Sequence, residues 1–330
     1  MNDVDRGSVL VTGANGFVGS RLCRRLISDG YRVTAGVREG CDGTLIEDLD
    51  LEYRFGDVTH PETLPEMVRG IDYIVHNAGV VKVKRPETFF DVNQIGTRNI
   101  LDAAKASPHL KKFVYISSTA AAGPSKPREP LTEAAPPYPV TAYGRSKLAG
   151  ENEVLNFADS INSVIIRPTG IYGPGDREMF TFFKSLNDRI KPYLGNPGRR
   201  IQLVHVDDLA LGVGRALQAE TKPGSVYFVA EAEGYSYYML VKHLRQAVGR
   251  MALPIYIPGF LVRLMAHLSE TLMKAWGKTP MFTAEKANEI LDNWEVSVEK
   301  ARRELGFEAE IPFPEGARAT VYWYREEGWL

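Results

Sequence analysis

The strongest constraint on the fold is a strand that runs directly into a glycine-rich turn near the N-terminus. Residues 9–19 read VLVTGANGFVG, with glycines at positions 13, 16 and 19. Gly13 permits a tight turn, Gly16 lets the backbone approach a ligand, and Gly19 allows a helix to pack closely on the strand. The free N–H groups at the start of that helix favour an anion. This order of elements predicts a dinucleotide-binding unit.

Short β-branched runs alternate with longer segments of helical period from residue 8 to about residue 228. Buried parallel strands read as such continuous apolar runs, and right-handed crossovers then give an α/β fold with a doubly wound parallel sheet. The predicted strands are Val9–Thr12, Arg32–Val37, Glu52–Phe55, Tyr73–His76, Lys112–Ser117, Ser163–Arg167 and Val226–Val229. The predicted helices are Phe17–Asp29, Pro61–Val68, Pro86–Ala106, Ala142–Ala158 and Asp207–Gln218. The ligand site is expected at the carboxyl ends of the strands.

The strand–helix alternation fades after Gly234, which predicts a smaller mixed C-terminal lobe for the substrate. We expect residues 1–170 and about 200–232 to form the dinucleotide-binding domain, and residues 171–199 and 233–330 to form this lobe. Its apolar side chains would receive a hydrophobic substrate or fill the lobe's own core, which is the commoner outcome. They are Phe260, Leu261, Leu264, Met265, Leu268, Leu272, Met273, Trp276, Met281 and Phe282.

The stretch Pro258–Met273 is apolar on one side, with Arg263, His267 and Glu270 interspersed. Such a helix either faces a core or pocket, or rests on a membrane surface. We favour the core-facing or pocket-lining helix. Peripheral membrane contact stays open, and stable insertion is not expected because no run of 18 apolar residues occurs.

The net charge separates the classes of partner. Forty basic and 41 acidic residues give a formal net charge of −1, so no global field attracts nucleic acid, and a small-molecule substrate fits better. The two cysteines make no disulfide framework, which favours a reducing compartment. With no signal-like N-terminal segment, we expect a cytoplasmic protein. No metal site is expected.

The residues that follow the second, third and fourth strands indicate which cofactor binds and what contacts it. An acidic residue after the second strand would bind the ribose 2′-hydroxyl of NAD, whereas this strand is followed by Arg38, whose guanidinium can pair with a 2′-phosphate. This favours NADP(H), with NAD(H) as the alternative. Asp57 is expected to contact adenine or to cap a helix. Ala78 and Gly79 are small enough to let the backbone approach the cofactor.

Tyr143 and Lys147 stand at i and i+4, which places both on one face of a helix. The lysine charge is expected to lower the pKa of the phenol, so that the tyrosine can give or take the proton that accompanies hydride transfer. Hydroxyls of Ser117, Ser118 and Thr119 follow the fifth strand and can polarise a carbonyl. His76 and Asn93 are interpreted as mainly structural.

These motifs, in this order, resemble the extended short-chain dehydrogenases/reductases, the NAD-dependent epimerase/dehydratase-like superfamily. The resemblance covers roughly residues 8–320 and also rests on Asn93, on the run RPTGIYGPG at 167–175 and on VHVDDLA at 204–210. It implies that Ser118, Tyr143 and Lys147 are catalytic. The predicted cofactor contacts are Gly13, Asn15, Gly16, Phe17, Val18, Gly19, Arg38, Asp57, Val58, Ala78, Gly79, Tyr143, Lys147, Pro168, Gly170 and Ile171.

Within the superfamily, the segment after the serines reads TAAAG at 119–123 and lacks the Asp-Glu pair of dehydratases. The chain is most similar to the 3β-hydroxysteroid dehydrogenase and dihydroflavonol reductase branches, which implies interconversion of a ketone and a secondary alcohol on a sterol-, lipid- or polyketide-like molecule. The alternatives are a nucleotide-sugar 4-epimerase, with Arg199, Arg200 and the loop Gly195–Gly198 on a diphosphate, and a non-catalytic NADP(H) sensor. Members of this superfamily often form homodimers, so a homodimer is a further expectation from the resemblance.

Overall fold

The computed structural model describes residues 6–275 and 282–330, and its centre is a seven-stranded sheet. The strand order is β11-β6-β5-β4-β1-β2-β3, and every neighbouring pair is parallel. The strands are β1 (Ser8–Thr12), β2 (Arg32–Val37), β3 (Glu52–Phe55), β4 (Tyr73–His76), β5 (Lys112–Ile116), β6 (Ser163–Pro168) and β11 (Ser225–Val229). The predicted doubly wound Rossmann sheet is confirmed, with strand bounds that agree within one residue.

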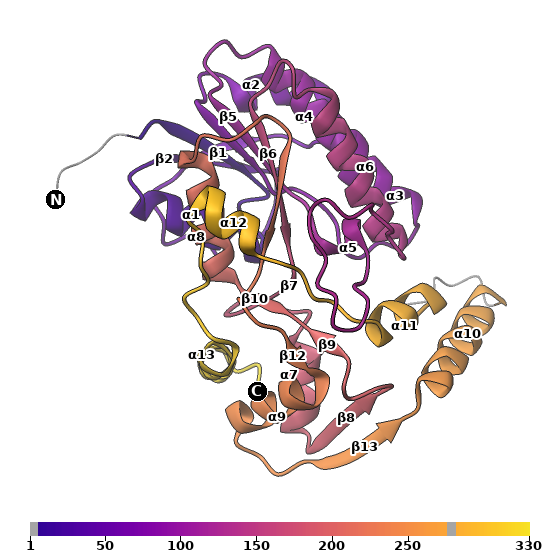
Figure 1. Ribbon diagram of the computed structural model, residues 1–330. Helices are drawn as coiled ribbons and strands as arrows, with labels where there is room; N and C mark the ends of the chain where they lie inside the picture. The colour runs from indigo at the N-terminus through magenta and orange to yellow at the C-terminus, as the bar shows by residue number, and fades with distance from the viewer. Residues whose placement is uncertain (1–5, 276–281) are drawn as a thin grey trace.

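Helices cover both faces of this sheet (Figure 1). One layer holds α1 (Phe17–Ser28), α8 (Val206–Gln218) and α12 (Glu299–Leu305). The other holds α2 (Leu64–Val68), which follows a 3-10 turn at Pro61–Thr63, together with α4 (Gly96–Lys105) and α6 (Ala142–Asn156). Because successive strand residues point to opposite faces, each strand contributes to two separate cores.

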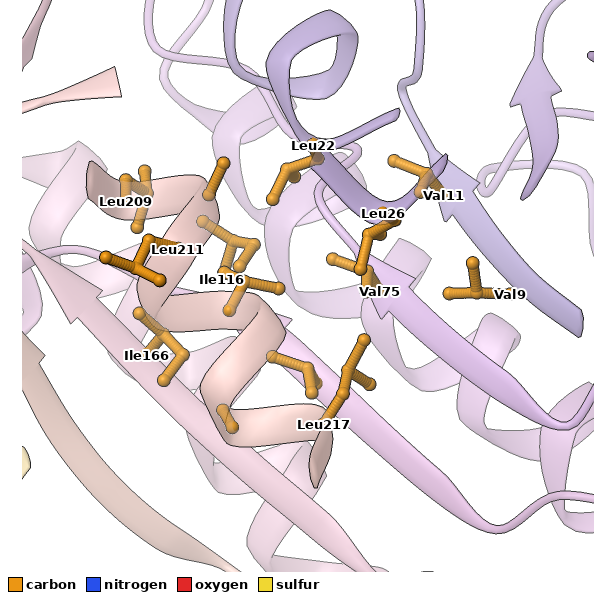
Figure 2. Packing of buried hydrophobic residues seen from close by; sticks show 14 of the residues in the cluster. Val9, Val11, Leu22, Leu26, Val75, Ile116, Ile166, Leu209, Leu211 and Leu217 are labelled. Carbon is orange, nitrogen blue, oxygen red and sulfur yellow. The ribbon is translucent and has the colours of Figure 1, made fainter. Parts of the chain in front are cut away.

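The first core lies between the sheet and the α1 and α8 helices, as Figure 2 shows. Leu22 and Leu26 of α1 are fully buried there beside Val9 and Val11 of β1. Leu10 points to the opposite face and belongs to the core beneath α2 and α4. Burying one such side chain contributes roughly 1.5–3 kcal/mol, so this alternation fixes the register of β1 strongly.

The helix predicted at residues 86–106 is present but is not uniform. It consists of α3 (Glu87–Phe90), a π-helical turn at Asp91–Ile95 and then α4. A π turn holds one residue more than an α-helical turn, and such turns are frequent at functional sites.

A smaller mixed lobe is present, as predicted, and lies below the sheet in Figure 1. The bounds predicted for it are wrong for α12, which falls within residues 233–330 but packs on β11 and α8. Three two-stranded sheets pair β7 (Gly170–Tyr172) with β10 (Leu203–His205), β8 (Ile190–Leu194) with β13 (Leu253–Ile257), and β9 (Arg200–Ile201) with β12 (Tyr235–Ser236). The helices of this part are α7 (Phe180–Asn187), α9 (Tyr237–Val248), α10 (Gly259–Ala275), α11 (Ala284–Leu291) and α13 (Phe313–Glu326).

The apolar residues of this lobe were predicted to receive a substrate or to fill the core of the lobe, and for most of those on α10 this prediction is wrong. Six apolar side chains of this helix are between 37% and 66% exposed: Phe260, Leu261, Leu264, Met265, Leu268 and Leu272. The smaller Val262 and Ala266 are buried instead, and Phe282 packs beside them. Trp276 and Met281 lie outside the described residues. Within the described residues, no helix has the length and apolarity needed to cross a bilayer.

Candidate active site

A cleft of about 2930 Å³ runs along the carboxyl ends of the central strands and continues into the second lobe. It lies where the strand order reverses, between β1 and β4, which is the place where doubly wound sheets bind their ligands. Most of the predicted site residues line it: Gly13, Asn15, Gly16, Phe17, Val18, Arg38, Asp57, Val58, Ala78, Gly79, Ser118, Tyr143, Pro168, Gly170 and Ile171. Gly19 and Lys147 lie beneath this surface.

The glycine turn fits a pyrophosphate. Gly13 has a φ of +66°, a backbone conformation that side chains disfavour. A Cβ on Gly19 would overlap the carbonyl oxygen of Gly13, so only glycine lets α1 approach the strand this closely. The N-cap of α1 is Gly16, which has no side chain that could bind the first N–H groups of the helix. The first turn of α1 therefore offers its backbone N–H groups to an anion in the cleft.

Arg38 and Asp57 meet at the end of the cleft beyond the glycine turn. The Asp57 carboxylate accepts hydrogen bonds from the Thr59 N–H and the Thr59 hydroxyl, both at 2.8 Å. Burial raises the pKa of Asp57, but these bonds and the charge of Arg38 outweigh it, so the pKa is lowered overall. Asp57 thus closes a turn with Thr59 and does not cap a helix as the second interpretation had it, since His60 is the N-cap of the helix that follows. Asp57 also lines the cleft.

The two hydroxyls expected to hold a substrate oxygen lie together. Ser118 caps α5 (Thr119–Ala122) by accepting a bond from the Ala120 N–H at 3.1 Å, and its hydroxyl is near enough to the Tyr143 phenol to lower the pKa of that group. Burial raises the pKa of Tyr143 to about 12, the Ser118 hydroxyl opposes this, and Glu289 adds to it. The lowered pKa predicted for Tyr143 is therefore wrong for this structure, because the cost of burying a phenolate outweighs the hydroxyl that favours it.

The neighbouring hydroxyls have structural partners. Ser117 donates to Glu151, and Thr119 donates to the carbonyl of Pro168 at 2.7 Å. Both side chains belong to buried residues, whereas Ser118 is partly exposed in the cleft. Among the three hydroxyls considered from the sequence, Ser118 is the one placed to meet a substrate.

Lys147 lies under the cleft, almost completely buried. Its Nζ donates to the carbonyl of Ile116 at 2.6 Å and sits 4.4 Å from the centroid of the Tyr115 ring. Burial lowers the pKa of Lys147 to about 7, against the opposing charge of Glu151. Near neutral pH this amine can therefore exchange a proton, which an ordinary exposed lysine does not do.

A buried ion pair that sequence reasoning missed supports these groups. Arg167 binds Glu151 through two hydrogen bonds of 2.9 and 2.6 Å, and the two side chains are 5% and 2% exposed. Ser117 completes the network. The signal was available, because Glu151 continues the i, i+4 series of Tyr143 and Lys147 by one further helical turn.

Asn93 has a larger positioning role than the sequence suggested. From the π turn its amide accepts a bond from the Val80 N–H at 2.9 Å, donates to the Val80 carbonyl at 3.1 Å and donates to Ser146 at 3.0 Å. It therefore ties the loop that follows β4 to α6, rather than to a strand. His76 is structural as predicted, since it bridges the hydroxyls of Thr12 and Thr97.

The second lobe also reaches the start of α6, the helix that carries Tyr143. Glu285 of α11 accepts a bond from the Ala142 N–H at 2.8 Å and another from Arg145 at 2.8 Å. The same α6 terminus is capped by Thr141, whose hydroxyl accepts from the Gly144 N–H. No local sequence signal links Glu285 to this helix, because the two lie 143 residues apart.

The arginines expected to bind a sugar diphosphate do not line the cleft. Arg199 is buried, lies 3.6 Å from the Tyr237 ring centroid, and donates to the backbone carbonyls of Leu194 and Asn196. Arg200 pairs with Glu295 at 2.9 Å. Both guanidinium groups are engaged in holding the second lobe together, so the epimerase interpretation loses its predicted diphosphate contacts.

An open parallel sheet with this glycine turn, and with a Tyr-Lys helix at its carboxyl edge, defines a Rossmann-type dinucleotide-binding enzyme. Residues 9–230 match the NAD dependent epimerase/dehydratase family. The chain belongs to this family of extended short-chain dehydrogenases/reductases, whose members act on CH–OH groups.

Similar proteins extend the comparison to nearly the whole chain. A ceramide reductase of Caulobacter vibrioides is 31% identical, over 98% of this chain and 96% of that protein. A 3 beta-hydroxysteroid dehydrogenase/Delta 5→4-isomerase of Mycobacterium tuberculosis is 29% identical, over 92% of this chain and 86% of that protein. The crystal structure of gox2253 superposes with a TM-score of 0.84 at 28% identity, and the match covers 98% of this chain and 99% of that one.

Proposed function

We propose that the protein is an NADP(H)-dependent oxidoreductase that interconverts a ketone and a secondary alcohol on a hydrophobic, sterol-, lipid- or polyketide-like substrate. The observation that carries this proposal is the presence of Ser118 and Tyr143 together in the wall of the cleft, with the buried Lys147 beneath it. A bound nicotinamide dinucleotide supplies or accepts the hydride. The protein then has to hold one oxygen atom and move one proton.

Ser118 and Tyr143 suit those two tasks. In the reducing direction both hydroxyls donate to the ketone oxygen, and the Tyr143 O–H proton moves to that oxygen as the carbon gains the hydride. The raised pKa of Tyr143 keeps the phenol protonated before the reaction. Lys147, whose pKa is lowered to about 7, is poised to return a proton to the phenolate after each turnover.

The cleft wall beyond these hydroxyls supports an apolar substrate. Apolar side chains line it from the loop after β4, α3 and the π turn, the start of α7, β10, α10 and the C-terminal segments: Val80, Val81, Val83, Phe89, Val92, Met179, Leu203, Met273, Trp294, Trp323 and Trp329. Such walls bind hydrophobic molecules, with few polar groups to orient them. The names of the ceramide reductase and of the hydroxysteroid dehydrogenase point to the same substrate class.

The test is turnover of NADPH with long-chain 3-ketolipids and 3-ketosteroids by the purified protein. We expect substrate-dependent NADPH oxidation, and we expect Tyr143→Phe to lower kcat roughly 10²- to 10⁴-fold because general acid catalysis is removed. Tyr138→Phe is the matched control, since Tyr138 is 76% exposed. Interconversion of a nucleotide sugar without net oxidation would replace this proposal with the epimerase, and cofactor binding without any turnover would replace it with the sensor.

Arg38 is proposed to select NADP(H) over NAD(H) through the 2′-phosphate. A hydrogen bond to a charged group contributes about 1.5–3 kcal/mol, so Arg38→Ala should raise the KM for NADPH roughly 10- to 100-fold and leave that for NADH nearly unchanged. Arg98→Ala on α4, an exposed arginine outside the cleft, is the control. Equal effects on both cofactors would refute this role.

A further inference from the structure

The outward side of α10 is the feature that the proposed chemistry does not use. Its six exposed apolar side chains, named above, recur along one side of the helix, while Val262 and Ala266 on the other side pack against Ala287 and Leu291. We call these six residues the α10 face. Single exposed apolar residues are ordinary on soluble proteins, but a row of six large ones on one helix marks a contact surface.

The strand that leads into this helix extends the apolar character. Leu253 and Tyr256 of β13 are 75% and 62% exposed, and Met251 just before the strand is 81% exposed. In Figure 1, β13 and α10 follow one another along the outer edge of the second lobe, away from the central sheet. The helix is thus presented at an extremity, where a large flat partner can approach it.

Charge identifies the kind of partner. Residues 242–275 contain five lysines and arginines and one acid, Glu270, in a chain whose total charge is −1. Lys242 and Arg245 lie on α9, Arg250 precedes β13, and Arg263 and Lys274 lie on α10, which alone has a formal charge of +1. Arg263 and His267 are exposed on α10, whereas Glu270 is partly buried and accepts a bond from the Ala284 N–H at 3.3 Å. Arg263 thus lies on α10 itself, and Arg245 lies 3.9 Å from Met251 beside the exposed β13 strand. An apolar surface with basic residues beside it is the pattern of helices that lie in the interface of an anionic membrane.

The opposite side of the same helix belongs to the cleft. Glu270 and Met273 line it, and α10 packs on α11, whose Glu285 holds the start of α6. A surface that rests on the α10 face is therefore separated from the cleft by the thickness of this one helix. A second copy of this chain is a poorer occupant, because a two-fold interface would set the same cationic segment against itself.

We propose that the α10 face docks on an anionic lipid bilayer, with the helix lying in the interface and the cleft on the opposite side of the same helix. The apolar side chains supply the burial and the surrounding cations supply the attraction to lipid phosphates. Docking stands on these surface observations alone. Delivery of a bilayer-resident substrate to the cleft is its consequence, and that consequence rests on the proposed function.

The test is flotation of the full-length protein, without cofactor, with vesicles of phosphatidylcholine alone or mixed with phosphatidylglycerol. We expect binding to the anionic vesicles that weakens as salt rises. Leu268→Glu should weaken binding at least about tenfold, since an apolar contact is lost and a negative charge is added. Leu155→Glu on α6 is the matched control, because the same substitution is made at 46% exposure against 50% for Leu268.

One further variant and two further measurements distinguish docking from its alternatives. Leu268→Ser removes the apolar contact without adding charge and serves if the glutamate variant does not fold. Equal loss of binding in the Leu155 and Leu268 variants would overturn the proposal, as would absence of wild-type binding to either vesicle. If the Leu268 variants instead convert a dimer to a monomer on size exclusion, the α10 face is a subunit interface. Oxidation of NADPH with a short soluble ketone is read separately, so failure of docking and failure of the proposed reaction are distinguishable.

Discussion

The buried pair of Glu151 and Arg167 gives a sharp prediction about stability. Replacing Glu151 with glutamine keeps the shape but leaves the Arg167 guanidinium without a counter-charge in a site where its side chain is only 5% exposed. Removing one partner of a buried pair costs about 3–5 kcal/mol. The glutamine NH₂ group also faces a donor where the carboxylate accepted a bond at 2.6 Å. We therefore expect Glu151→Gln to lower the free energy of unfolding by about that amount.

The measurement is urea unfolding followed by tryptophan fluorescence, with an exposed pair as the control. Arg24 binds Asp48 in the same bidentate manner, through two bonds of 2.6 Å, but its carboxylate is 58% exposed. Asp48→Asn should change the stability little, because solvent screens an exposed pair. If both variants destabilise the protein equally, burial does not govern the Glu151 pair and the reasoning fails.

Three further predictions test the site. The pKa of Lys147 is lowered to about 7, so between pH 7 and 9 this residue binds more protons in the unfolded chain than in the folded protein. The free energy of unfolding should therefore rise by about 2 kcal/mol over this pH range. Thermal melts should show this rise for the wild type and not for Lys147→Met. Gly19→Ala should abolish NADPH binding in a fluorescence titration, because its Cβ meets the Gly13 carbonyl, whereas Gly43→Ala, with open space around it, should not. Glu285→Ala should cost about 1 kcal/mol of stability and lower kcat, since the first turn of α6 loses a partner; unchanged kcat would leave Glu285 a purely structural role.

The parts of the structure that local chemistry determines could be predicted from the sequence. Strands of a parallel sheet buried on both faces are continuous apolar runs, so β1 and β6 were visible as such. The glycine turn is determined by close backbone contacts at Gly13 and Gly19, which no other residue allows. Because the carboxyl ends of parallel strands lie at one edge of the sheet, the meeting of Ser118 with the first turn of α6 at that edge could be expected as well, although the strand order itself was not predicted.

The remaining features depend on tertiary burial, which spacing does not encode. The i, i+4 relation of Tyr143 and Lys147 is correct, but the pKa of the phenol depends on how far the surrounding chain excludes water. The periodicity of α10 shows an apolar face without showing what covers it, and here the small Val262 and Ala266 pack inward while the larger Leu264 and Leu268 do not. Amphipathicity alone cannot choose between those two sides.

The π turn at Asp91–Ile95 means that this helical run contains one residue more than its packing on the sheet needs. A single deletion there lets the run relax to an ordinary α-helix while Ile100 and Leu101 keep their places in the core. What disappears is the direction of the Asn93 amide towards Val80. The extra residue of the π turn is thus not needed for the fold, but it is needed to hold the loop above the cleft. Relatives in which this helical run is one residue shorter are expected to keep the architecture and lose the reaction.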